Sequence, residues 1–367
     1  MKWSLKIGTF AGIGVYLHWT FALLLGWVFM MYLRAGNTAV EALAGIGFIL
    51  ALFACVVLHE FGHALTARRY GVNTRDITLL PIGGVARLEK IPDNPVQEFW
   101  VAVAGPAVNV AIAAVIFVFL MVMDGASRLL DFQWAHSGFL VQLMWVNIVL
   151  VVFNMLPAFP MDGGRVLRAL LALRMGRRRA TIIAANIGQA MAILFGIAGF
   201  MINPMLIFIA VIVYLGAQAE SAHVELQSAL EGLCVRDAMM TRFRTLSPHD
   251  SLATAVEEML AGSQHDFPVL DGGTLLGILR HDDLIKALAQ GQGSATVADV
   301  MCAECGPVDE TAALTPILET MNRNRCSIAP VLNGGRLVGL LTRENIGELA
   351  MVSGTFGHHH AHPLGAG

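Results

Sequence analysis

The residues of this chain whose types and spacing could do chemistry begin with His59-Glu60-Phe61-Gly62-His63, inside the apolar run from Ala42 to Leu65. On a helix, His59 and His63 are one turn apart on one face, so two imidazoles can bind one metal ion. Glu60 lies beside them, where it can accept a proton from a metal-bound water. Two histidines and one carboxylate suit zinc and leave its fourth position open for that water. Because ionisable groups are costly to bury at membrane depth, their presence here indicates function.

A carboxylate for such a site is offered by Asp162. It follows the apolar run Phe139–Leu156, in a segment where Pro157 and Pro160 interrupt the helix and Gly163-Gly164 allow a sharp turn. An acidic residue at this position could be an interfacial salt-bridge partner. However, the two histidines need a carboxylate at their own depth, and this need favours Asp162 as the third zinc ligand.

The composition predicts a membrane protein. Of the 367 residues, 56% are hydrophobic and only 14% are charged, and the apolar residues concentrate before residue 220. We expect a polytopic α-helical domain of about six transmembrane helices. The runs of spanning length are Val15–Leu33, Ala42–Leu65, Phe99–Met123, Phe139–Leu156, Thr181–Ile202 and Pro204–Ala219.

The distribution of Lys and Arg predicts how these spans are oriented. Thirteen Lys and Arg lie in the loops on the side of the termini and two on the other side, which places both termini in the cytosol. The metal site then lies in the cytosolic half of the membrane. The net charge of −3 gives no indication of a nucleic-acid partner, the N-terminus shows no cleavable signal peptide, and the five cysteines are expected to be reduced.

Two further features of the membrane half have alternative interpretations. Strand-like segments flank Ile82-Gly83-Gly84, which predicts a short membrane-associated β-hairpin soon after the helix that carries the histidines. Gly83 and Gly84 would belong either to a plain cytosolic hairpin or to a strand edge that pairs with an unwound substrate. Asn109, in the third span, is either an interhelical hydrogen-bonding residue or part of the site.

These motifs together resemble the site-2 protease family of intramembrane zinc metalloproteases. The resemblance rests on the His59–His63 motif and on the segment Asn154 to Asp162, which is followed by Gly163-Gly164-Arg165. The segments Pro81–Ala86 and Ala104–Asn109 also resemble that family. It implies one Zn²⁺ per chain held by His59, His63 and Asp162, with Glu60 as general base. It also implies that Asn154 holds the substrate backbone or the oxyanion. The implied substrate is a transmembrane helix of a membrane-bound regulatory protein, in a prokaryotic cell membrane.

The second half of the chain is an internal repeat. Residues 235–288 match residues 297–350 at a constant offset of 62, as in Pro268-Val269-Leu270 against Pro330-Val331-Leu332. Each copy predicts helix, strand–turn–strand and helix, and the pair resembles tandem cystathionine-β-synthase (CBS) domains, a soluble α/β module. The predicted boundaries are 1–222 for the membrane domain, 223–234 and 289–296 for linkers, 235–288 and 297–352 for the repeats, and 353–367 for a disordered His-rich tail.

Many CBS pairs bind adenine nucleotides, and the resemblance implies two candidate contacts. The nucleotide signature places Thr or Ser three residues before Asp, and each repeat keeps half of it: Asp283 in the first and Thr342 in the second. An adenine-nucleotide sensor and a structural or dimerising module, which would form a homo-oligomer, both fit this pattern.

Two other functions are compatible with the sequence. CBS pairs also regulate transporters and channels, although here the intramembrane charges gather in one ligand set instead of lining a pathway. A catalytically inactive scaffold that binds transmembrane partners is the second alternative, although such a protein would be expected to lose Glu60 or a ligand.

Overall fold

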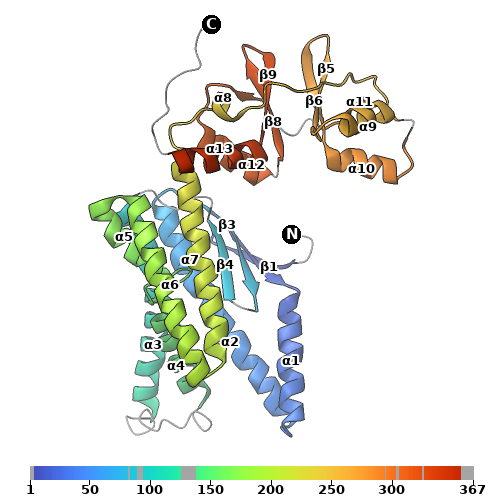
Figure 1. Cartoon of the computed structure of the whole chain (residues 1–367). Coiled ribbons are helices and arrows are strands. Elements are labelled where there is room, and N and C mark those ends of the chain that lie inside the picture. Colours follow the sequence, from blue (N-terminus) through green and yellow to red (C-terminus); the bar gives the residue numbers. More distant parts are fainter. Residues whose placement is uncertain are drawn as a thin grey trace. The chain divides into compact units, whose positions relative to one another are not determined.

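A computed structural model describes residues 4–81, 83–88, 94–124, 138–293, 295–302, 306–324 and 326–356. The chain forms two compact units, Met1–Val224 and Glu225–Gly367. The first is a helical bundle with a small sheet, and the second contains the repeat (Figure 1).

The first unit is built mainly from apolar helices. Within the described residues, four helices are long and apolar enough to cross a membrane, namely α2, α3, α6 and α7. Two shorter apolar helices are α1 and α4. Helix α5 is the more polar one that follows the Pro-rich segment. The helices are α1 Thr20–Arg34, α2 Ala39–Arg69, α3 Pro95–Asp124, α4 Phe139–Asn154, α5 Asp162–Met175, α6 Arg177–Met201 and α7 Met205–Ala229.

Helix α2 begins at a capping box and packs closely on α3. Thr38 and Glu41 exchange hydrogen bonds, since the Glu41 amide donates to Thr38 Oγ1 at 3.3 Å and the Thr38 amide donates to Glu41 Oε2 at 2.7 Å. Further along, a Cβ on Gly62 would lie 2.6 Å from the carbonyl oxygen of Ala104. The backbones of α2 and α3 therefore meet between the two histidines, as small residues allow in membrane bundles.

A four-stranded sheet lies beside α2 (Figure 1). Its strands are β1 Ser4–Phe10, β2 Ile13–His18, β3 Thr74–Leu80 and β4 Gly83–Leu88, in the order β1-β2-β3-β4. The β2–β3 pair is parallel and the other two pairs are antiparallel, with Leu79 opposite Gly84 and Leu80 opposite Gly83. The predicted hairpin is confirmed as β3–β4, but it belongs to a larger sheet.

The structure corrects two predictions about the membrane half. The first span was expected from Val15, but residues up to His18 form β2. Ile13 and Val15 of this strand are buried, and residues 14–17 pair with both β1 and β3. The basic segment after Asp162 was expected to be a loop, but it forms α5. Its first turn carries Asp162 and its last turn carries Arg174, as the helix dipole favours.

The second unit confirms the predicted repeat. Equivalent elements of the two copies start at the same offset of 62 residues or within one residue of it, as with α9 and α12. The first copy consists of α8 Val235–Ala238, α9 Leu252–Ala261, β5 Phe267–Asp271, β6 Thr274–Leu279 and α10 His281–Ala289. The second consists of α11 Val297–Val300, β7 Val308–Asp309, α12 Leu314–Asn324, β8 Ile328–Asn333, β9 Arg336–Thr342 and α13 Arg343–Phe356.

The cysteines differ in part from the expectation of reduced thiols. Cys55, Cys234 and Cys302 are not in disulfides, but Cys326 is disulfide-bonded. Helix α7 runs to Ala229, so the first part of the predicted linker 223–234 is helical. The predicted disordered tail begins within α13, and residues 357–367 lie outside the described part of the chain.

Candidate metal centre

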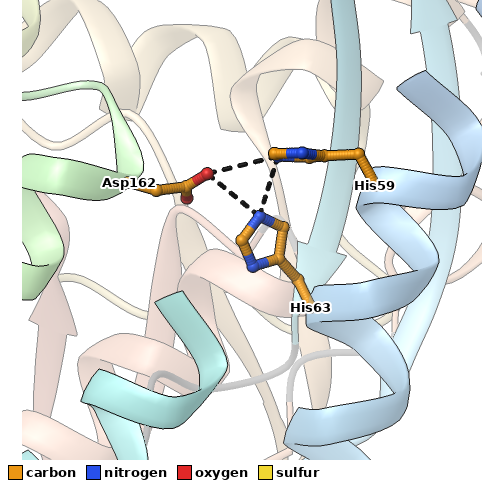
Figure 2. A group of neighbouring side chains, drawn as sticks. All are labelled: His59, His63 and Asp162. Carbon is orange, nitrogen blue, oxygen red and sulfur yellow. Dashed lines mark hydrogen bonds and ion pairs between the residues drawn. The ribbon is translucent and has the colours of Figure 1, made fainter. Parts of the chain in front are cut away.

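Three side chains from two helices converge on one point. His59 and His63 extend from α2, and Asp162 meets them from the first residue of α5 (Figure 2). The two Nε2 atoms are 3.0 Å apart, and Asp162 Oδ2 lies 3.2 Å from that of His59 and 3.1 Å from that of His63. All three residues are buried. Within the described residues, this is the group of His, Cys, Asp or Glu side chains whose ligand atoms lie close enough to hold a metal ion.

The other nitrogen of each imidazole is fixed by a neighbour on α3. His59 Nδ1 lies 2.9 Å from Asn109 Oδ1, and His63 Nδ1 lies 2.7 Å from the carbonyl oxygen of Val101. Both partners are acceptors, so each Nδ1 carries the proton and each Nε2 presents its lone pair to the centre. Metal-binding histidines are oriented in this way in proteins.

Asn109 and Asn147 form a buried polar chain behind the histidines. Asn109 Nδ2 donates to Asn147 Oδ1 at 3.1 Å, and Asn147 Nδ2 donates to the carbonyl oxygen of Leu143 at 2.8 Å. Both asparagines are fully buried. Of the two interpretations of Asn109, these contacts match the interhelical hydrogen-bonding residue, here between His59 of α2 and Asn147 of α4. Asn147 was not predicted from the sequence, although an Asn inside an apolar span was the available signal.

The spacing of the three ligand atoms fits a tetrahedral zinc ion. Ligands at about 2.0–2.1 Å from zinc in tetrahedral directions are separated by roughly 3.3 Å, close to the separations found here. The surroundings also leave room, because residue 105 is a glycine. A Cβ at Gly105 would lie 2.1 Å from His63 Nε2 and 2.7 Å from His59 Nε2. The residues present therefore fit a metal ion.

Glu60 follows His59 on α2, and its side chain lies against strand β4 of the sheet. A Cβ on Gly84 would lie 2.8 Å from Glu60 Cγ and 3.2 Å from its Oε1, so the backbone of β4 rests against this side chain. Glu60 is half-buried. Gly84, predicted from the sequence, is thus placed beside the predicted general base. Gly83 is the first residue of the same strand, with a φ of +136° that suits glycine.

The remaining predicted residues lie elsewhere. Asn154 is the last residue of α4 and is half-buried, and the contacts of the described residues do not join it to the metal cluster. In the second unit, Asp283 Oδ2 accepts from Arg280 Nε at 2.6 Å, and Oδ1 lies 3.4 Å from Lys286 Nζ. Thr342 caps α13, since the Asn345 amide donates to its Oγ1 at 3.1 Å.

A second buried ionic cluster was not predicted from the sequence. Arg168 of α5 is 1% exposed, and its Nη2 lies 2.5 Å from Oε1 of Glu98, at the start of α3. Its Nη1 is paired with Glu220 of α7, and its guanidinium stacks over the ring of Phe159. This cluster ties α5, and hence Asp162, to two other helices of the bundle.

Comparisons with known proteins identify the family of the chain. A sequence model of Peptidase family M50 matches residues 47–133 and 127–195, and one of the CBS domain matches 235–290 and 297–349. Zinc metalloprotease MJ0392 of Methanocaldococcus jannaschii is 34% identical over 94% of this chain and 96% of its own length. Rip3 of Mycobacterium tuberculosis is 29% identical over 95% and 93%.

Among solved structures, the site-2 protease from Methanocaldococcus jannaschii is 37% identical and covers 60% of this chain and 95% of its own, with a TM-score of 0.44. The similarity to zinc metalloprotease MJ0392 extends over nearly the whole length of both sequences and includes the CBS repeat. The chain therefore belongs to the site-2 proteases of Peptidase family M50 and is a membrane zinc metalloprotease with a C-terminal CBS pair.

Proposed function

We propose that this protein hydrolyses a peptide bond within or near a transmembrane segment of a membrane-bound regulatory protein. One zinc ion per chain is held by His59, His63 and Asp162. The observation that carries the proposal is the convergence of these three buried ligand atoms at 3.0–3.2 Å, beside Glu60. The same ligand set weighs against a transporter, because the polar groups close around one point.

Different residues of the chain contribute to different steps of peptide hydrolysis. A bound zinc ion supplies Lewis acidity and makes water more acidic. Glu60 accepts the proton of the attacking water and delivers it to the leaving amine, as a general base and then a general acid. Asn109 and the Val101 carbonyl hold the two imidazoles in one tautomer and orientation. Asn154, at the end of α4, would contact the substrate backbone.

The edge of β4 is the proposed docking strand for the substrate. Among the described strands, β4 pairs only with β3, so the other edge of its backbone is available for one more strand. A transmembrane helix hides its carbonyls in its own hydrogen bonds, so it must unwind before it can be cut. An unwound segment paired with β4 at Gly83 and Gly84 would pass beside Glu60.

The proposal is tested with a fluorogenic apolar peptide of transmembrane length that carries a central Gly-Pro helix break. The full chain in detergent is expected to cleave it, and Glu60→Gln is expected to bind zinc and peptide without cleavage. Addition of 1,10-phenanthroline should stop the wild-type reaction, and added Zn²⁺ should restore it. Cleavage by Glu60→Gln at the wild-type rate would contradict the role of Glu60. Tight peptide binding without cleavage by the wild type would indicate the inactive scaffold.

The CBS pair is proposed to bind an adenine nucleotide and to regulate the protease. The support is the family match of both repeats and the half signature that each retains at Asp283 and Thr342. Self-association through this module belongs to the same proposal. We also propose that both termini lie in the cytosol of a prokaryotic cell, as the excess of Lys and Arg on that side indicates.

A further inference from the structure

Arg165 lies on the first turn of α5, three residues after Asp162, so the two side chains share a helix face. Its Nη1 is 3.8 Å from Asp162 Oδ1. The histidines face the other carboxylate oxygen, Oδ2. Arg165 therefore approaches the metal-site carboxylate on the side that the metal does not use.

Two donor atoms of Arg165 are buried and unused. Its Nε and Nη2 are enclosed and have no hydrogen-bond partner among the described residues, and the side chain is 17% exposed. Enclosed guanidinium nitrogens without partners are rare, because each forgoes the hydrogen bonds that water would give it. Arg168, one turn further along, shows the usual solution, since carboxylates of two helices surround it.

The guanidinium of Arg165 lies beside the metal-site carboxylate, since its Nη1 is 3.8 Å from Asp162 Oδ1. Asp162 is its ion-pair partner, and Glu60 is close enough for an electrostatic interaction with it. The guanidinium is planar and offers Nε and Nη2 as two parallel donors. These two N–H groups, the guanidinium fork, have no acceptor in the structure described. A carbonyl oxygen that enters the space beside Glu60 would be a suitable acceptor for both.

We propose that Arg165 is a further catalytic residue, which donates hydrogen bonds from Nε and Nη2 to the carbonyl oxygen of the scissile peptide. The inference rests on the proposed function. As water adds to the carbonyl carbon, negative charge develops on that oxygen, and the hydrogen bonds strengthen. Arg165 keeps its proton throughout, and no covalent bond to it forms or breaks. Its contact with Asp162 holds the fork in place.

The test compares Arg165→Ala and Arg165→Lys with Arg174→Ala, an exposed arginine on the same helix. With the fluorogenic peptide, Arg165→Ala should lower kcat about 10²–10³-fold with little change in KM, the effect of losing an oxyanion donor. Zinc content should remain at the wild-type level. Guanidinium chloride at millimolar concentration should restore part of the activity of Arg165→Ala but none of that of Glu60→Gln. Arg165→Lys keeps the positive charge but lacks the planar pair of N–H donors, so its activity should stay below that of the wild type.

A second readout does not depend on turnover. A phosphinic peptide, which carries a tetrahedral anionic group in place of the scissile amide, should bind Arg165→Ala at least tenfold more weakly than wild type. Loss of zinc from Arg165→Ala would show that Arg165 only anchors Asp162, and equal affinity for the phosphinic peptide would also overturn the proposal. If the wild type cleaves no peptide, the proposed function fails, and the phosphinic peptide still decides the role of Arg165.

Discussion

The metal centre depends on the absence of a side chain at Gly105 as much as on its three polar residues. A Cβ there would overlap the Nε2 atoms of both histidines, at 2.1 and 2.7 Å. Real Cβ atoms do not approach other atoms so closely. The helices could make room only by moving apart, and this would cost the close α2–α3 packing at Gly62.

Gly105→Ala should therefore abolish stoichiometric zinc binding without unfolding the bundle. The matched control is Gly47→Ala on α2, where a Cβ would meet no atom within 4 Å. Metal content of both variants after gel filtration checks this. A full zinc complement in Gly105→Ala would mean that the helices yield at this point.

Asn109→Leu should weaken zinc binding 10–100-fold, because it removes the acceptor that holds His59 in its metal-binding tautomer. It also leaves Asn147 with one partner fewer. Competition with a chromophoric chelator measures the affinity. Val110→Ala, an exposed neighbour on α3, should leave it unchanged, and a similar loss in both variants would contradict a specific role of Asn109.

At this scale the sequence predicted what local spacing determines. His59, Glu60 and His63 follow from one helical turn, and Asp162 follows from the depth at which it leaves its span. The hydrogen-bond acceptors of the two histidine Nδ1 atoms could not be predicted from the sequence, because their identity depends on how α3 is rotated against α2. The unused donors of Arg165 were likewise invisible without coordinates.

At the scale of helices and strands, Arg168 joins α3, α5 and α7. Its guanidinium and the Glu98 carboxylate are 1% and 2% exposed, so neither has water as an alternative partner. Removing one member of such a pair leaves a buried charge without compensation, and the penalty is larger than the net benefit of the pair itself.

Arg168→Leu should lower the free energy of unfolding by about 3–5 kcal/mol, measured by denaturant titration in mixed micelles. Arg174→Ala on the same helix should change it by less than about 0.5 kcal/mol. A double variant, Arg168→Leu with Glu98→Leu, should recover part of the loss because no buried charge is left on α3. Equal stability of Arg168→Leu and the control would contradict this account of the cluster.

The strands show where reasoning from an apolar run fails. Residues 13–18 are apolar enough to extend the first span, and hydropathy does not distinguish a strand from the start of a membrane helix. Only the pairing of β2 with β1 and β3 decides it, and β3 lies more than fifty residues away. The β3–β4 hairpin was predictable because its two strand-like segments are close in sequence, although Gly83 and Gly84 belong to β4 and not to the turn.

At the scale of the whole chain, the repeat is its most predictable feature. A constant offset of 62 fixed equivalent elements in both copies, and the core residues Leu252 and Leu314 occupy matching positions. The ligand of the module was less predictable, because each copy keeps only half of the nucleotide signature. Asp283 is bonded to Arg280, so a nucleotide would have to displace that contact.

Asp283→Ala should weaken AMP binding to the full chain about 3–10-fold, the effect of one hydrogen bond lost. Isothermal titration calorimetry in detergent measures the affinity. Asp271→Ala, which removes an exposed carboxylate at the end of β5, is the matched control. Unchanged AMP affinity in Asp283→Ala would remove this residue from the nucleotide site, and the lack of any AMP binding by the wild type would favour a structural or dimerising module.

His59, His63 and Asp162 are proposed to hold one zinc ion while Glu60 accepts the proton of the attacking water. Metal content of the purified protein, with the His-rich tail after Gly357 removed, tests it most directly. Wild type and Glu60→Gln should each contain about one zinc per chain, and Asp162→Ala should contain almost none. A wild type without zinc, or an Asp162→Ala variant that retains it, would contradict the account.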